Sequence, residues 1–470
     1  MLFVFTWDNY MINKNVSAFL GCSLLALTAF AAPVNPFASN NGQIPPSSEY
    51  SGPLFELSHS YPSKAPVPAM PWRTVIGNGL ITTKNAGAYA QALKDAVSKD
   101  MRVLIEDYAN WNAAKRGWYN EPWLGAQREA IHGMYVGNGM LDTSLFKASG
   151  LTKPMTTYVL TYYDRTAAQT LQRVWKTTAM QPVITTASTQ FPEGALIVKA
   201  SFITADPTVW PVMEGSQAWP LYITVDATTG GSKTPKVVNT YFMQFDIIVK
   251  DSKSAPKTGW VYSTLVYDKN APGKSVWDKM VPLGAQWGND PQANSTRNPS
   301  APLVENWINP AAPPYGSETL GWGGRLSGPN DGAMNDIAFT AGGKQQLVKN
   351  AQDSSCMSCH STAQWDVKNG RMPSFLLPAT SNPPATTGPG GNYLVSPAPG
   401  SAEWLRWFQN RKGTVPMDKG SVATDFDMVL AFKSLPAWYS ATSGKKTPLK
   451  AADPAGKSRV MMYSGKELVE

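Results

Sequence analysis

Three residues with nucleophilic or metal-binding side chains lie within five positions of one another, at Cys356, Cys359 and His360. They belong to the sequence CMSCH, in which two thiols are three positions apart and an imidazole follows the second thiol directly. This spacing lets the thiols reach neighbouring vinyl groups of one porphyrin while the imidazole binds its iron. The CxxCH pattern is typical of covalent haem attachment. We therefore expect one haem c, held by Cys356 and Cys359, with His360 as an iron ligand.

Other uses of a CxxC pair fit this sequence less well. A structural zinc site needs four ligands, usually two Cys or His pairs, and the only other histidines are His59 and His132. A thioredoxin-like dithiol needs no histidine and follows a strand in a βαβ unit, and a disulfide across CxxC is rare. The third cysteine, Cys22, lies in an apolar run near the start of the chain. It is either a small apolar residue or a lipid acceptor, and the apolar residues after it favour the first.

The composition is that of a globular protein with few charges and many turn residues. The 470 residues are 43% hydrophobic and 16% charged, with 38 Gly, 38 Pro and 17 Trp, which favours a β-rich fold over a helical bundle. Lys and Arg number 41 against 33 Asp and Glu, and the resulting net charge of +8 is spread along the chain. This charge favours an acidic partner or an anionic membrane surface. Nucleic acid is not expected, because no binding motif accompanies the charge.

The first 31 residues are organised like a secretory signal peptide. A polar stretch containing Lys14 precedes the apolar run at 16–30, and the sequence AFA at 29–31 provides a small-x-small cleavage site. The run is shorter than the about 20 residues of a membrane-spanning helix, so we expect no transmembrane span in the mature chain. Met11 is a better start for such a signal than Met1. A periplasmic or secreted protein is expected.

The next 300 residues predict a β-rich domain. Residues 32–75 are rich in Pro, Ser and Asn and predict an irregular segment. Residues 76–330 contain a helical pattern at 86–98, followed by apolar runs separated by Gly and Pro turns, which is typical of a sandwich-like or barrel-like domain. The predicted strands are 101–105, 155–163, 170–175, 195–203, 221–225, 237–249 and 260–267.

A loop-rich stretch ending near residue 330 predicts a domain boundary. After it, residues 331–445 predict a small all-α domain with helices at 344–352, 402–411 and 421–435, and a Pro/Gly-rich loop at 378–400. Thr424 and Asp427 resemble a capping box for the last helix. Residues 446–470 are expected to form a C-terminal tail. The predicted fold class is α+β overall, with a β-rich sandwich-like N-terminal domain followed by a small all-α domain.

The order of these C-terminal elements resembles a class I c-type cytochrome domain, over about residues 337–440. The resemblance implies a methionine as the sixth iron ligand, in a loop just before the last helix, and Met417 stands at that place. The other interpretation of Met417 is a packing residue. Met428 falls inside the predicted last helix, and Met372 follows His360 too closely to reach the opposite face of a haem. The long Pro/Gly insertion departs from compact members of the family.

The same resemblance implies roles for three further residues. The carbonyl of Pro373 would accept a hydrogen bond from His360 and fix its orientation. Trp407 would pack on the haem and Arg406 would meet a propionate. Ordinary helix packing and a solvated Arg406 explain these two residues equally well.

These features favour a periplasmic or secreted mono-haem c-type cytochrome that transfers electrons, with no substrate of its own. Basic residues around the haem would steer an acidic partner, and they are Lys344, Lys349, Lys368, Arg371, Arg411, Lys412 and Lys419. The alternative is a haem-dependent oxidoreductase whose β-rich domain binds a small molecule and passes electrons to the haem. A third hypothesis makes residues 76–330 a binding module. His132, with Glu129 nearby, is interpreted as structural, and this region has no phosphate loop, catalytic triad or dinucleotide motif.

Overall fold

The computed structural model describes residues 34–224, 234–380 and 385–443. The predicted signal peptide at 1–31, with Cys22, and the predicted tail at 446–470 lie outside these ranges. From Asn35 onward the described residues belong to one compact unit, and side chains from both sides of residue 330 share its largest core cluster. Within the described ranges, no helix is both long enough and apolar enough to cross a membrane.

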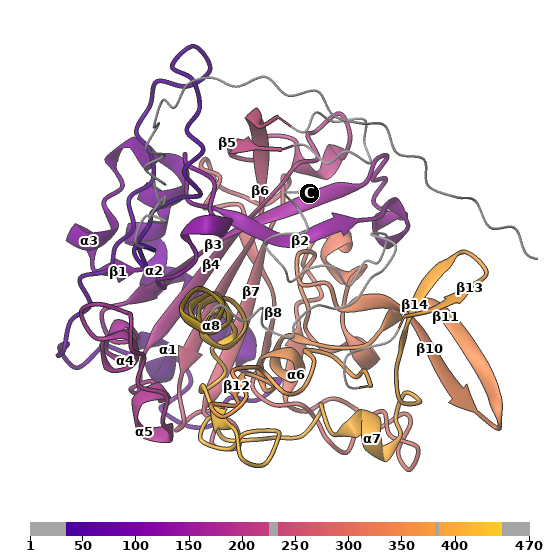
Figure 1. The fold of residues 1–470 in the computed structure, drawn as a ribbon. Coiled ribbons are helices and arrows are strands. Elements are labelled where there is room, and N and C mark those ends of the chain that lie inside the picture. The colour runs from indigo at the N-terminus through magenta and orange to yellow at the C-terminus, as the bar shows by residue number, and fades with distance from the viewer. Residues whose placement is uncertain (1–33, 225–233, 381–384, 444–470) are drawn as a thin grey trace, which may run out of the picture. The chain divides into compact units, whose positions relative to one another are not determined.

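A nine-stranded antiparallel sheet is the main element of the chain up to residue 308 (Figure 1). Its strands follow the order β1-β3-β4-β6-β7-β8-β9, while β2 pairs with β3 and β5 pairs with β6. β-Branched and aromatic residues, which pack well on a pleated surface, fill most of these strands. The strands are β1 (Trp118–Tyr119), β2 (Tyr135–Leu141), β3 (Met155–Asp164), β4 (Leu196–Ile203), β5 (Ala218–Ile223), β6 (Lys236–Lys250), β7 (Trp260–Tyr267), β8 (Met280–Gln286) and β9 (Asn306–Ile308).

Most of the predicted strands are confirmed. The apolar runs between turn residues located β3, β4, β6 and β7 to within about one residue at each end, and β5 in part. Every residue of β7 is buried, so this strand shows no alternation of exposed and buried side chains. A strand that is covered on both faces reads as a continuous apolar run, so this sheet has chain packed on both of its sides.

Two predicted strands are helices instead. Helix α2 (Ala86–Glu106) includes the helix predicted at 86–98 and also the strand predicted at 101–105, because Met101 continues the four-residue spacing that begins at Tyr89. The segment at 170–175 belongs to α4 (Ala168–Trp175), whose buried residues recur at three and four positions. The short helices of this part are α1 (Pro71–Thr74), η1 (Tyr108–Asn110), α3 (Ala113–Arg116), η2 (Gly125–Gln127), η3 (Thr143–Phe146), α5 (Thr186–Thr189), η4 (Pro211–Met213), η6 (Pro314–Ser317) and η7 (Trp322–Gly324).

The C-terminal part is not the small all-α domain that we expected, so the predicted fold class is wrong. It contributes a second sheet in the order β11-β10-β14-β13 and a strand pair, β12 with β15, among short helices (Figure 1). The elements are β10 (Met334–Ala341), β11 (Lys344–Gln352), α6 (Cys356–His360), β12 (Gln364–Trp365), β13 (Ala385–Gly388), β14 (Gly391–Val395), α7 (Ala402–Leu405), β15 (Val422–Ala423), the π-helical turn η8 (Leu430–Ser434) and α8 (Leu435–Ser443).

The helix predicted at 344–352 is strand β11, and a glycine pair explains the difference. Ala341 on β10 pairs with Lys344 on β11, so Gly342 and Gly343 form a two-residue hairpin loop. Their φ angles are +57° and +75°, and a two-residue hairpin loop of type I′ needs positive φ at both positions. The pair Gly342-Gly343 was therefore the stronger signal, and the apparent helical spacing of the following residues was misleading.

The last predicted helix begins later than expected. Residues 422 and 423 form β15, and the helix starts after Asp427, whose Oδ1 accepts the backbone N–H of Leu430 at 3.1 Å. Asp427 thus caps the helix, while Thr424 donates its hydroxyl to the carbonyl of Asp427 at 3.1 Å. The helix predicted at 402–411 shortens to the four residues of α7.

The turn between β15 and the last helix is held against the main sheet. Asp425 and Phe426 have φ angles of +50° and +69°, a region that side-chain-bearing residues rarely adopt. The Asp425 carboxylate accepts hydrogen bonds from Lys250 Nζ at 2.6 Å, Trp260 Nε1 at 2.7 Å and Phe191 N at 2.8 Å. Because Asp425 is fully buried, these three bonds are what hold the strained turn in place.

We expect Asp425→Asn to lower the free energy of unfolding by about 3 kcal/mol, because it leaves the ammonium of Lys250 without its buried counter-ion. Urea denaturation followed by tryptophan fluorescence measures the loss. Glu403→Gln makes the same acid-to-amide change on an exposed side chain and should stay within about 0.5 kcal/mol of the wild type. A loss no larger than that of the control would show that the carboxylate does not anchor the turn.

Candidate haem-attachment site

Helix α6 carries the three CxxCH residues on one short turn. Ser355 caps it: Ser355 Oγ accepts the N–H of Ser358 at 3.2 Å, and Ser358 Oγ accepts the N–H of Ser355 at 2.8 Å. This reciprocal capping box satisfies two backbone donors that a helix start leaves free. Cys356 and Cys359 are three positions apart on the helix, so their thiols lie on the same side.

A glutamine at the end of β8 docks this helix on the main sheet. Gln286 Nε2 donates to Ser355 Oγ at 3.2 Å, and Gln286 Oε1 accepts the N–H of Met357 at 3.0 Å. Gln286 and Met357 are both fully buried. The amide therefore fixes the position of α6 relative to the strands through both of its polar atoms.

Both cysteines of the motif are free thiols in the structure. Cys356 is buried and Cys359 is partly buried. Burial is the main cause that raises the pKa of each thiol, that of Cys359 to about 12, so both are protonated at neutral pH. The Cys356 thiol donates to Asp331 Oδ2 at 3.5 Å.

The imidazole of His360 is fixed by a backbone carbonyl. His360 Nδ1 lies 2.9 Å from the carbonyl oxygen of Phe426, and because a carbonyl only accepts, Nδ1 carries the ring proton. Burial lowers the pKa of His360 to about 4, so the ring is neutral and Nε2 keeps its lone pair. The ring of Tyr262 packs against the imidazole with a centroid separation of 4.7 Å. A neutral imidazole with its proton on Nδ1 is the tautomer that can bind a metal through Nε2.

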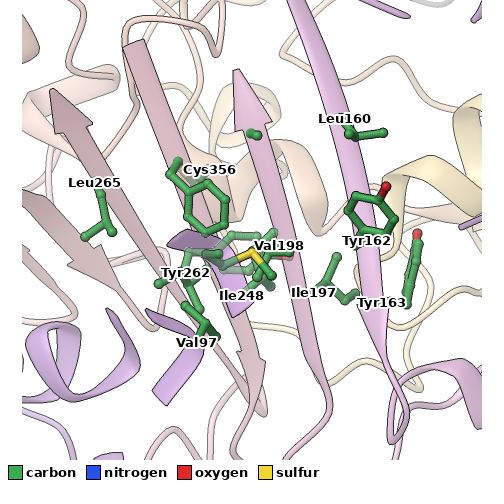
Figure 2. Close-up of a cluster of buried hydrophobic side chains, with 14 of the residues drawn as sticks. Val97, Leu160, Tyr162, Tyr163, Ile197, Val198, Ile248, Tyr262, Leu265 and Cys356 are labelled. Carbon is green, nitrogen blue, oxygen red and sulfur yellow. The ribbon is translucent and has the colours of Figure 1, made fainter. Parts of the chain in front are cut away.

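The motif lines a cavity of about 180 Å³ that is open to solvent. Cys356, Cys359 and His360 line one wall. Another wall is lined by residues of the segment 426–433, namely Phe426, Asp427, Met428, Val429, Phe432 and Lys433. The floor is one face of the main sheet. In Figure 2, Ile197, Ile248 and Tyr262 lie on β4, β6 and β7, and the register pairs them in one row. The floor is therefore apolar along this row.

The neighbouring row of the floor is polar. Thr161, Lys199, Asp246 and Thr264 are paired in register across β3, β4, β6 and β7, and all four line the cavity. Lys199 Nζ lies 2.8 Å from Asp246 Oδ2 and 3.0 Å from Asp331 Oδ1, and Thr264 Oγ1 donates to Asp246 at 2.7 Å. Burial by itself would lower the pKa of Lys199, but the two carboxylates outweigh it and raise that pKa.

Several polar atoms of the cavity wall have no partner among the described residues. They are Tyr262 Oη, Ser327 Oγ and Asn330 Oδ1, each on a residue less than 5% exposed. Buried polar atoms are rarely left unpaired, because each costs free energy. A ligand with an apolar face and a polar edge would satisfy this wall and the apolar floor together. Haem has both, so the residues present fit it.

The structure does not bring Met417, the predicted sixth ligand, to this cavity. Met417 is buried in a separate cluster with Trp322, Trp404 and Phe408, and it is not a lining residue. Its position matches the alternative interpretation of a packing methionine. Met428 packs against a core cluster that includes Met372 and Phe432, and it also lines the cavity.

Three further predicted residues also lie apart from the cavity lining. His360 forms its hydrogen bond with the carbonyl of Phe426 and not with that of Pro373, because the strained turn brings residue 426 to the imidazole. Arg406 is exposed and forms an ion pair with Asp418. Trp407 is buried, and its indole N–H donates to the carbonyl of Phe375 at 3.0 Å. All three assignments came from a helical domain that this chain does not form.

His132 is held in the core of the β-rich part. Its ring stacks on Trp219 with centroids 4.1 Å apart, and its Nδ1 bonds the carbonyl of Pro220 at 3.0 Å. Glu129 accepts backbone N–H groups from the same turn, including that of His132. Both side chains are therefore used in packing, in agreement with their structural interpretation.

The polar row is the part of the site that sequence reasoning missed. Lys199 and Asp246 each stand directly between apolar residues of a strand, in the sequences LIVKA and FDIIV. A charged residue inside an apolar strand points to a buried ion pair or a ligand. That signal was present, but only the register of β4 with β6 shows that the two charges meet.

Within the described part of the chain, no group of three or more His, Cys, Asp or Glu side chains is placed to hold a bare metal ion. The chain matches no protein-family model, no curated protein and no solved structure. The site is therefore interpreted from its own geometry.

We expect Met428→Leu, but not Met417→Leu, to change the Soret and visible bands of the haem-loaded protein, because only Met428 lines the cavity. Each substitution conserves side-chain volume and should cost less than about 1.5 kcal/mol of stability. Absorption spectra of the oxidised and reduced proteins compare the pair directly. A change confined to Met417→Leu would identify Met417 as the ligand after all.

Proposed function

We propose that this chain is a mono-haem c-type redox protein, which binds one haem covalently in the cavity over the main sheet and transfers electrons through it. One observation carries the proposal. Both thiols and the imidazole of the CxxCH motif line one cavity that is open to solvent, and the imidazole is held with Nε2 available. These are the groups that haem c attachment uses.

Attachment would add each of the two thiols to a vinyl group of the haem. The S–H group of each cysteine adds across one vinyl C=C bond: sulfur bonds one carbon, hydrogen bonds the other, and the π bond is consumed without a leaving group. The free state of Cys356 and Cys359 supports this step. Because such attachment takes place outside the cytoplasm, the proposal includes export to the periplasm or beyond through the predicted signal at 1–31.

A bound haem c supplies a one-electron couple between ferric and ferrous iron. The chain would orient and shield it. The Phe426 carbonyl keeps the proton of His360 on Nδ1, and a hydrogen bond of this kind tunes a metal-bound imidazole. Lys199 pairs with Asp246 and Asp331 beside Cys356. Fixed, paired charges need little rearrangement when an electron arrives.

The partner in this proposal is an acidic redox protein. The chain carries a net charge of +8, and the exposed strand β11 presents Lys344 and Lys349. Opposite charges steer such a partner to the surface before contact and raise the association rate at low salt.

A second function, haem-dependent oxidation or reduction of a small molecule, is favoured by a specific observation. The cavity contains more ionisable and hydrogen-bonding side chains than attachment requires, including Lys433 and Asp427. Met417, the expected sixth ligand, belongs to a different cluster. A haem iron without a second protein ligand can bind an external molecule.

Mass spectrometry tests the main proposal. We expect protein from a host that attaches haem c to exceed its polypeptide mass by one haem, under denaturing conditions, and to show a Soret band. The double variant Cys356→Ser/Cys359→Ser should lose the added mass. His360→Gln should shift the Soret band, whereas His59→Gln, which changes an exposed histidine, should not. A wild-type protein with the bare polypeptide mass and no Soret band would end the proposal.

The ferric spectrum separates the two functions. A low-spin spectrum with the weak far-red band of an iron–thioether bond is expected for electron transfer with both axial positions filled. A high-spin spectrum would favour the reaction with a small molecule, since the iron then has an open or water-filled position.

A further inference from the structure

The two amines of the cavity have different surroundings. Lys199 Nζ has two carboxylate partners, at 2.8 Å and 3.0 Å. Lys433 also lines the cavity, but across the described ranges of the chain its ammonium has no hydrogen-bond acceptor and no ion-pair partner. Within those ranges the ammonium makes a cation–π contact with the ring of Tyr135, whose centroid lies 5.4 Å from Nζ.

The acids that line the cavity are all engaged elsewhere. Asp246 and Asp331 pair with Lys199. Asp427 accepts the hydroxyl of Tyr163 at 2.9 Å and 3.1 Å, and it also caps the helix that carries Lys433. The wall around Lys433 therefore supplies no counter-ion.

Lys433 is partly buried, and burial lowers its pKa to about 8. At neutral pH the side chain is still mostly charged. Val429, one turn earlier on the helix, lines the same wall, so the ammonium lies beside apolar groups. A charge in such surroundings is costly unless an anion pairs with it.

The sheet register places Lys433 and His360 at opposite ends of the cavity floor. Tyr135 on β2 pairs with Val159 on β3, whereas Tyr262, which packs on His360, belongs to β7. Three strands, β3, β4 and β6, lie between β2 and β7, so the two backbones are roughly 19 Å apart at ~4.8 Å per interval. An anion at Lys433 would therefore lie away from the iron-binding imidazole.

We propose that Lys433 is an anion-binding residue of the cavity, whose ammonium pairs with a carboxylate. This inference rests on the proposed function and adds a second recognition point to the same site. The carboxylate has two sources with the same chemistry: a propionate of the haem, or a free small carboxylate that enters beside it. Arg406, the residue that the cytochrome resemblance nominated for a propionate, is engaged with Asp418 on the surface.

The test compares full-length, haem-loaded proteins. Lys433→Met removes the charge and keeps the length of the side chain, Lys433→Arg keeps the charge, and Lys84→Met removes an exposed charge as the matched control. For each protein we would measure the haem content by intact mass, the midpoint potential in a buffer without small carboxylates, and the affinity for formate by calorimetry. Thermal melting identifies variants that fail to fold.

If a propionate is the anion, Lys433→Met lowers the midpoint potential or the haem content without added anion, because a positive charge beside the haem favours the ferrous state. If a free carboxylate is the anion, the potential stays unchanged and formate binding weakens by at least about tenfold. In both cases Lys433→Arg restores most of the wild-type value, and Lys84→Met has no effect.

A Lys433→Met protein that equals the wild type in haem content, potential and formate affinity overturns the inference. So does an equal effect in Lys84→Met, since the charge would then act without a specific contact. If Lys433→Met does not fold, Lys433→Gln takes its place in the same three measurements, because it also removes the charge, and a Lys433→Gln protein that equals the wild type in all three overturns the inference. A wild-type protein that takes up no haem would instead refute the proposed function.

Discussion

The candidate site depends on one hydrogen bond, between His360 Nδ1 and the carbonyl of Phe426. That carbonyl points at the imidazole only because Phe426 and the residue before it adopt positive φ angles. The strained pair persists because Asp425 is bonded to Lys250 and Trp260, on β6 and β7 of the main sheet. The sheet thus sets the orientation of an imidazole that lies far from it in sequence. In this chain the CxxCH segment supplies the reactive groups, and the sheet supplies their geometry.

The same relation explains how much the sequence could predict. The use of the CxxCH thiols and imidazole stays a prediction. Local patterns were enough for most strands, because an apolar run between Gly and Pro turns marks a buried strand directly. They failed where two periodicities compete over a short segment. Residues 344–352 have helical spacing, yet the preceding Gly342-Gly343 loop makes them the second strand of a hairpin. Residues 101–105 are apolar enough for a strand but continue the stripe of α2.

The residues assigned through the cytochrome resemblance were harder to predict for a different reason. A ligand such as Met417 is fixed by the fold around it and not by its own neighbours in sequence. Once the C-terminal part pairs strands and packs on the main sheet, Met417 joins an aromatic cluster. The Phe426 carbonyl takes the place assigned to Pro373. The ion pair of Lys199 with Asp246 depends likewise on the register of two strands, which single-strand patterns do not contain.

The chain order of the cavity walls has a consequence for assembly. The floor comes from β2, β3, β4, β6 and β7, all of which precede the thiols at 356 and 359, whereas residues 426–433 close the cavity from the far side and come last. The thiols are therefore synthesised after the floor of the cavity and before the segment that lines its other wall. The segment whose Phe426 carbonyl orients the histidine is the last part of the cavity to leave the ribosome.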